Sequence, residues 1–174
     1  TSRKGLGQVE RRYELSGLKL KEAARLFRVI SSEKSLDTMA TLSEDIVNNI
    51  VSRLSLYPLA IKWAIGNVAL GKDINEIVAN IHEETSDVSL FCFDLIFKNL
   101  SSGSCYLLYA MTLFTEPVSS GPLTYISSLS KTEFEDSIHE LLLVSLILQS
   151  HVSCGDGQVV NHYALLPLTR GYLL

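Results

Sequence analysis

Three side chains that could bind a metal ion lie around a glycine-containing turn in the last quarter of the chain. His151, Cys154 and His162 carry the nitrogen and sulfur atoms that zinc prefers, and they flank a turn expected between two short strands. A structural zinc site needs four ligands at a recognised spacing, and the sequence offers no fourth ligand here. We therefore expect no metal site at this turn.

The sequence also lacks a candidate for nucleophilic or phosphate chemistry. No serine or cysteine can be assigned a histidine partner, and the G-x-x-x-x-G-K-[ST] loop that cradles nucleotide phosphates is absent. Cys92, Cys105 and Cys154 form no C-x-x-C pair, so the sequence indicates neither a disulfide framework nor structural zinc. We expect no catalytic residue in this chain, and a reducing, cytoplasmic location.

Charge changes from basic to acidic along the chain. Residues 1–30 carry eight Lys or Arg against three acids, residues 31–100 five against ten, and residues 101–174 two against six. With 174 residues and 47% hydrophobic content, the chain can form one large or two small domains. Because no apolar run reaches the roughly 20 residues that span a bilayer, we expect no membrane partner.

Hydrophobic spacing predicts a helical bundle in the first half of the chain. After a short strand at 8–15, helices are predicted from about Leu20 to Ile30 and from Ser43 onward. Pro58 suits the first turn of a third helix, which is apolar nearly throughout and is expected at the centre of the bundle. Asp73 predicts a fourth helix, because its carboxylate can accept hydrogen bonds from the first turn.

A polar break at 83–87 separates this bundle from a second pattern, and Asp87 can cap the helix that follows. Helices are predicted at 88–100 and 103–114, and two more are predicted to start at Pro122 and to be capped by Thr132. Two strands are predicted after these helices. The second half of the chain therefore combines helices with strands, whereas the bundle before it is helical.

A hairpin is predicted at the end of this second pattern. Segments 146–152 and 159–165 bracket Cys154-Gly155-Asp156-Gly157, a strong turn signal. Helices followed by such a hairpin are typical of a winged helix. The sequence thus predicts a mainly α fold, with a helical bundle followed by a winged-helix domain that carries a small β-hairpin.

Several segments resemble the C-terminal part of an NB-ARC ATPase core. They are Thr1-Ser2-Arg3, Tyr13 to Leu18 with Glu22 to Phe27, Leu56 to Ile61, and Tyr163 to Tyr172. NB-ARC proteins belong to the STAND NTPases, which include plant resistance proteins, apoptosome scaffolds and many bacterial regulators. The resemblance divides the chain into the end of the NTPase core (1–18), a helical lid subdomain (19–85) and a winged-helix subdomain (86–174).

The resemblance also implies nucleotide-binding residues. Arg3 falls at the sensor position that reads the γ-phosphate, since a guanidinium binds phosphate oxygens in a bidentate manner. Tyr57, Pro58 and Leu59 fall in the family's G-x-P motif, whose proline packs beside adenine and ribose. Leu56 replaces the glycine of that motif, and Tyr57 could stack on a base or fill the bundle core.

The tail of the chain resembles a degenerate form of the family's Met-His-Asp segment. Leu165, Leu166 and Pro167 stand where Met, His and Asp would stand. The histidine that contacts the ADP β-phosphate in the family is therefore absent, and leucine cannot replace its polar contact. Either ADP is held less tightly or another group makes this contact.

The chain is thus expected to be a fragment of an ATP/ADP-dependent signalling switch. The implied cofactor is ADP or ATP with Mg²⁺ in the full-length parent, and none in the fragment alone. The implied partners are an upstream P-loop core, downstream repeat or effector domains, and further copies of the protein on activation. Whether the parent hydrolyses ATP stays open.

Two alternatives without a nucleotide role stay open. In the first, the chain is a structural interaction module that docks through Leu141 to Leu148 and Tyr172-Leu173-Leu174. In the second, it is a DNA-binding winged helix. The predicted recognition helix at 132–144 argues against DNA, because it carries four acids and no Lys or Arg.

Overall fold

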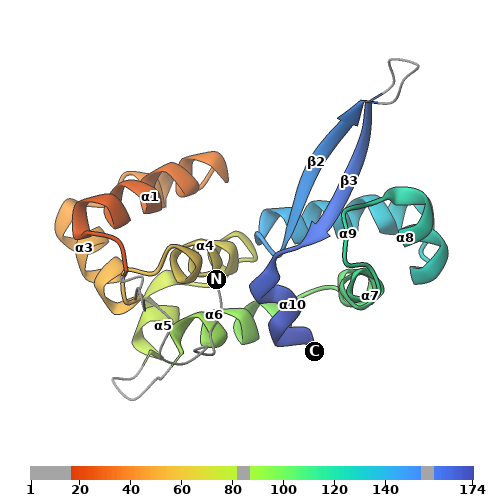
Figure 1. Cartoon of the computed structure of the whole chain (residues 1–174). Helices are drawn as coiled ribbons and strands as arrows, with labels where there is room; N and C mark the ends of the chain where they lie inside the picture. Colours follow the sequence, from red (N-terminus) through yellow and green to blue (C-terminus); the bar gives the residue numbers. More distant parts are fainter. Residues whose placement is uncertain (1–16, 82–86, 154–158) are drawn as a thin grey trace, which may run out of the picture.

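A computed structural model describes residues 17–81, 87–153 and 159–174. In these residues a helical bundle is followed by a winged-helix domain with a three-stranded antiparallel sheet (Figure 1). The predicted fold class is therefore confirmed. The strand predicted at 8–15, the domain boundary predicted between residues 85 and 86, and the turn predicted at 154–157 lie outside the described residues.

The bundle surrounds one apolar helix, α4. In the described part of the chain the bundle contains α1 (Leu20–Glu33), α2 (Asp37–Ala40), α3 (Glu44–Arg53), α4 (Pro58–Ala69) and α5 (Ile74–Ala79). The next helix, α6 (Val88–Phe97), packs along α4. The buried residues of α4 lie on all its sides, as its nearly continuous apolar sequence predicts.

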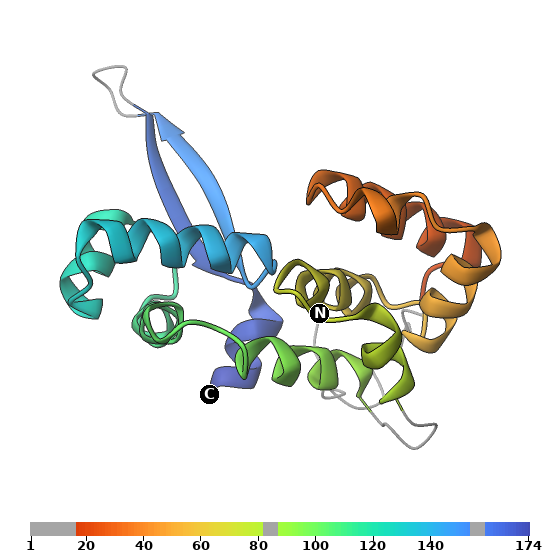
Figure 2. The ribbon, with the colours of Figure 1, turned by 180° about the vertical axis from the view of Figure 1, so that it is seen from behind.

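The winged-helix domain follows with its strands in the order β1-β3-β2. Its elements are α7 (Ser102–Thr112), β1 (Val118–Ser119), α8 (Ser120–Ser127), α9 (Lys131–Leu143), β2 (Ile147–Ser153), β3 (Val159–Leu165) and α10 (Pro167–Leu173). Figures 1 and 2 show the β2–β3 hairpin standing out from the helices. Across 17–81, 87–153 and 159–174, each helix is too short or too polar to cross a bilayer.

Helix starts follow the predicted chemistry in three places. Pro58 is the first residue of α4. Asp73 accepts hydrogen bonds from the backbone of the first turn of α5, and Asp87 accepts one from Leu90 N at 2.9 Å at the start of α6. Each of these residues satisfies or removes an N–H group that a helix start leaves without a partner.

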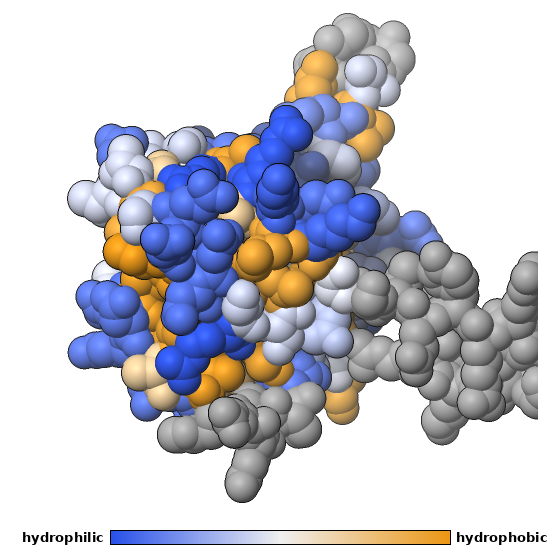
Figure 3. All heavy atoms as spheres, turned by 90° about the vertical axis from the view of Figure 1, so that its left-hand side faces the viewer, coloured by the Kyte–Doolittle hydropathy of each residue, from blue (hydrophilic) through white to orange (hydrophobic). Residues whose placement is uncertain are grey.

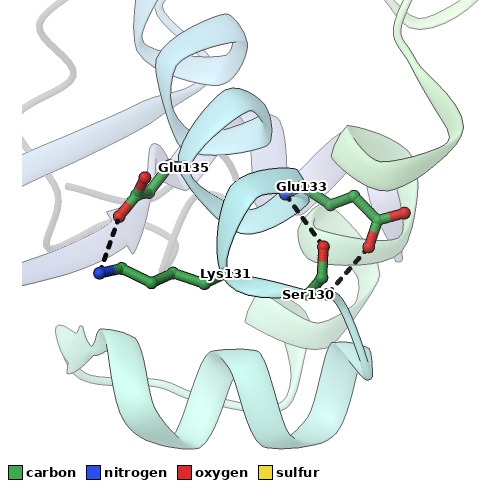
Figure 4. A network of polar contacts seen from close by, with 4 residues as sticks. All are labelled: Ser130, Lys131, Glu133 and Glu135. Atoms are coloured by element: carbon green, nitrogen blue, oxygen red, sulfur yellow. Dashed lines mark hydrogen bonds and ion pairs between the residues drawn. The ribbon is translucent and has the colours of Figure 1, made fainter.

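The start of α9 differs from the prediction. Ser130, rather than Thr132, is the capping residue: its hydroxyl accepts from Glu133 N at 3.3 Å, and Ser130 N donates to the Glu133 carboxylate at 2.9 Å (Figure 4). Lys131 therefore lies inside the helix, where its ammonium is 3.9 Å from Glu135. This reciprocal pair is the capping box that Ser-x-x-Glu encodes, so the signal was present in the sequence.

The bundle and the winged helix share one core at the turn between α9 and β2, which we call the α9–β2 turn (residues 143–146). The indole N–H of Trp63 donates to Ser145 O at 3.2 Å. The Lys34 ammonium donates to Leu143 O and lies 3.4 Å from Ser145 Oγ. Gly66 approaches Val144 so closely that a Cβ would lie 3.1 Å from its Cα. Three bundle residues thus hold one turn of the winged helix.

Candidate functional site

The chain turns sharply at the surface just before α4. Ser55 and Leu56 have left-handed backbone, with φ of 57° and 58°, a conformation that costs other residues roughly 1–2 kcal/mol relative to glycine. Leu56, which the sequence resemblance aligns with the glycine of the NB-ARC motif, adopts a left-handed backbone conformation that glycine favours. Tyr57 is then extended, with φ of −81° and ψ of 124°, and Pro58 begins the helix.

The predicted nucleotide-binding residues form the exposed end of this helix. Tyr57 is 46% exposed and Pro58 is exposed, while Leu59 is half-buried. Burial begins at the next two residues, because Ala60 and Ile61 are both 0% exposed. An aromatic ring and a proline therefore lie at the surface at one end of the most buried helix.

Gly17 and Leu18 lie directly on this turn. Leu18 N donates to Leu56 O at 2.9 Å. A side chain at Gly17 would place a Cβ only 2.8 Å from Ser55 O, so this contact requires glycine. Arg3, the predicted phosphate reader, lies outside the described residues.

The three residues expected at a degenerate Met-His-Asp position lie at the junction of β3 and α10. Leu165 is the buried last residue of β3, Leu166 is half-buried and precedes α10, and Pro167 is the first residue of that helix. Leu166 N is 3.4 Å from Leu146 O. The junction is thus built from apolar side chains, and its three residues offer no polar side chain to a phosphate group.

Arg170 fastens α10 to the end of α7. Its guanidinium donates to Thr112 O at 2.8 Å, to Met111 O at 3.4 Å and to Phe114 O. The last carbonyl groups of a helix lack partners within the helix and carry its negative dipole end. Arg170 therefore satisfies these carbonyls with a positive charge.

Tyr172 fastens α10 to the bundle. Its ring centroid lies 5.9 Å from that of Trp63 in α4 and 5.1 Å from that of Phe93 in α6. Its hydroxyl donates to Asp87 Oδ2 at 3.1 Å. Helix α4 begins directly after Tyr57, and helix α10 begins directly after Leu166. A cluster of aromatic rings therefore connects the two helices that follow the predicted nucleotide-binding segments.

Sequence reasoning missed the residues that make this connection. Trp63, the single tryptophan of the chain, lies in an apolar stretch whose sequence does not indicate its partners. Arg170 and Tyr172 lie in the tail that carries the resemblance, and the sequence does not indicate their contacts either. Contacts between residues so far apart in sequence leave no local pattern to detect.

The histidines of the hairpin do not form a metal site. His151 pairs with Asn161 across the strands, 2.8 Å between Nδ1 and Oδ1. His162 pairs with Ser150 in the adjacent register and so lies on the opposite face of the hairpin. Cys154 is outside the described residues, and the residues that are described contain no cluster of three or more potential metal ligands.

The two described cysteines are poor nucleophiles. Burial, with a contribution from Asp87, raises the pKa of the Cys92 thiol to about 12. Burial and the nearby Glu140 carboxylate raise the pKa of Cys105 as well. Because the thiolate is the reactive form, both raised pKa values lower the reactivity of these thiols near neutral pH.

The exposed face of α9 is acidic. Glu133, Glu135 and Asp136 are exposed, and Lys131 is the single Lys or Arg of this helix. Glu140 is used internally, because its carboxylate accepts from Ser101 N and from the hydroxyl of Ser104 at the start of α7. This face would repel the phosphates of a nucleic acid.

The chain matches no protein-family model, and no curated protein shows significant similarity to it.

Proposed function

We propose that this chain is the lid and winged-helix portion of a STAND-type, ATP/ADP-dependent signalling switch whose P-loop core lies upstream in the parent protein. The observation that carries the proposal is the exposed pair Tyr57 and Pro58 at the end of the buried helix α4. A surface tyrosine beside a rigid proline offers an apolar edge to a nucleobase. The buried body of α4 would hold that edge in a fixed orientation.

The residues of this chain fit the base of the nucleotide but not its phosphates. The Tyr57 ring can stack on adenine, and Pro58 has no N–H group that would need a partner there. Leu166 and Pro167 provide no donor for the phosphates, so the phosphates and Mg²⁺ would be held by the upstream core. In this proposal ADP stabilises the arrangement in which lid and core are closed, because its base contacts the lid and its phosphates contact the core.

The upstream core would rest on α1 beside the entering chain. Leu18, Leu26 and Val29 line an open groove there with Glu22 and Arg25. Figure 3 shows the side of the bundle that carries α1 and α3, where apolar patches lie between hydrophilic ones. Exposed apolar patches of this kind often mark contacts with another domain.

The test is the nucleotide content of the purified parent protein, measured after denaturation. We expect ADP to copurify with the parent, to fall with Pro58→Ala and Tyr57→Ala, and to be absent from the 174-residue chain alone. Tyr57→Phe is the matched control, because it keeps the ring and should retain ADP. A folded parent that carries no nucleotide would overturn the proposal.

One surface favours the alternative of an interaction module. Tyr106 and Tyr109 in α7 and the following residue Leu113 are 62%, 51% and 69% exposed, and their spacing places them on one face of the helix end. A nucleotide-free parent that binds a partner through this face would support that alternative. The acidic face of α9 disfavours DNA as the partner.

A further inference from the structure

Strand β2 has an open outer edge along its whole length. β2 pairs with β3, and β1 lies on the far side of β3. Among the described residues, Ile147–Ser153 make no backbone hydrogen bond except those to β3. Alternate residues of such a strand direct their N–H and C=O groups outward. The edge therefore presents a row of backbone groups that another strand could pair with.

This edge lacks the features that usually prevent pairing. The sequence Ile-Leu-Gln-Ser-His-Val-Ser contains no charged residue and no proline, and every residue after Ile147 is exposed. Its register with β3 is continuous from Ile147↔Leu165 to Ser153↔Val159, without a bulge. Natural proteins block open edges with charges, prolines, bulges or short strands. The hairpin also stands clear of the helices (Figures 1 and 2).

The strand is complementary to itself in the antiparallel direction. If two copies meet about a two-fold axis at Ser150, Leu148 lies opposite Val152 and Gln149 lies opposite His151. Apolar residues then meet apolar ones, polar residues meet polar ones, and no like charges are opposed. We propose that β2 pairs with β2 of a second copy of this chain, forming a sheet that continues through both hairpins.

The other strand of the hairpin is less suited to this role. β1 covers the outer edge of β3 at Tyr163 and His162, so the open part of β3 is short. Pairing through β2 is isologous and closes at two copies rather than growing into a filament. One seven-residue strand per copy makes a small interface, so the dimer should dissociate on dilution. The inference rests on the hairpin and is independent of the nucleotide proposal.

Disruption of the edge is tested on the 174-residue chain by sedimentation velocity across a concentration series. We expect a concentration-dependent dimer, and Leu148→Lys with Val152→Lys should weaken it at least about tenfold, because like charges then face each other across the axis. Val159→Lys is the control, since it places a lysine on β3 of the same hairpin, away from the open edge, and should leave the dimer intact. An equal mixture of the double-lysine chain with a Leu148→Glu, Val152→Glu chain should restore it.

A cross-link locates the axis. In a Cys105→Ser, Cys154→Ser background, Ser150→Cys should form an intermolecular disulfide under mild oxidation. Directly opposed residues have Cα atoms about 4.5–5.5 Å apart, which a disulfide can bridge. Gln149→Cys is the control, because two copies of residue 149 would lie diagonally, beyond about 7 Å.

Three results would overturn the proposal. They are a wild-type chain that stays monomeric at all concentrations, a mixture of lysine and glutamate chains that fails to associate, and a Gln149→Cys chain that cross-links as fast as Ser150→Cys. If circular dichroism shows that the double-lysine chain is unfolded, the cross-linking pair decides the outcome. A monomeric chain that instead binds an added strand-forming peptide would assign the edge to a different partner.

Discussion

Helix α4 and the β2–β3 hairpin use their side chains in opposite ways. Seven of the twelve residues of α4 are buried, and Asn67 even donates to Trp63 O and Cys92 O from inside the core. In β2, by contrast, six of seven residues are exposed. The side chains of α4 pack against both parts of the molecule, while the side chains of β2 stay exposed to solvent and can contact another chain. Both proposed contacts lie where internal packing ends: the first turn of α4 and the edge of β2.

Trp63→Ala should produce the largest loss of stability. Trp63 is 0% exposed, its ring contacts Phe93 and Tyr172, and its N–H holds the α9–β2 turn. Removing a buried tryptophan costs about 3–5 kcal/mol, measurable as a lower free energy of unfolding in urea. Trp63→Phe keeps much of the packing and should cost less. A loss from Trp63→Ala no larger than that of a surface substitution would show that α4 is not the central helix.

Gly66→Ala should come next. The added Cβ would lie 3.1 Å from Val144 Cα and 3.2 Å from Val144 O, and overpacking of this kind costs about 1–3 kcal/mol. Gly121→Ala in α8 is the matched control, because nothing lies within 4 Å of its Cβ position. That change should be neutral or slightly stabilising, since alanine favours helix more than glycine does. Equal effects of the two changes would argue against close contact between α4 and the α9–β2 turn.

Lys34→Met should have a smaller effect that depends on pH. Burial lowers the pKa of the Lys34 ammonium, and Lys62 adds to this while Glu33 opposes it. Between the lowered pKa and the unfolded value of 10.5, the unfolded chain binds more protons, so stability should rise with pH in that window. Lys34 is half-buried, and solvent screening should keep its contribution to the free energy of unfolding below about 1 kcal/mol.

The measurement for Lys34 is the difference in unfolding free energy between wild type and Lys34→Met at several pH values below and up to 10.5. Because other lysines and tyrosines also titrate there, only the difference between the two chains reports on Lys34. A difference that stays constant with pH would contradict a buried ammonium at the α9–β2 turn.

Val159→Thr should have the smallest effect on folding. Val159 is 62% exposed on the hairpin, and threonine keeps its β-branched shape. Surface changes of this kind alter stability by no more than about 0.5 kcal/mol, which thermal unfolding of the two chains can bound. A loss comparable to that of Gly66→Ala would mean that the hairpin belongs to the cooperative core.

Local signals in the sequence predicted most elements of the fold. Pro58, Asp73 and Asp87 each mark a helix start through the chemistry of one residue. Gly71, at φ of 88°, ends α4 as its freedom from a Cβ allows. The turn signal at 154–157, which lies between two predicted strands, predicted the hairpin. Each of these signals acts within a few residues, which is why the sequence carries them.

The elements that the sequence did not predict depend on distant partners. β1 has two residues and exists because Val118 and Ser119 pair with β3. Helix α10 is short, and Arg170 and Tyr172 anchor it to residues far earlier in the chain. Ser145 adopts a left-handed φ of 58° without being glycine, and its turn is held by Trp63 and Lys34.

The candidate site was predictable in part for the same reason. The position of Tyr57 just before a helix start follows from Pro58, but its exposure does not, because the sequence allows its ring to fill the core instead. The left-handed conformation of Ser55 and Leu56 does not follow either, because neither residue type favours it. The contact of Gly17 with Ser55 required the tertiary structure.

The contact of Arg170 with the end of α7 sets an order for folding during synthesis. Arg170 follows Thr112 by 58 residues. Strand β1 pairs with β3, which is also synthesised after it. While a ribosome is still producing the intervening residues, Thr112 O and Phe114 O cannot yet accept from Arg170 and must be hydrated instead. The winged helix should therefore close late and in one step, when α10 emerges from the exit tunnel, whereas the contacts of α1 with α3 can form much earlier.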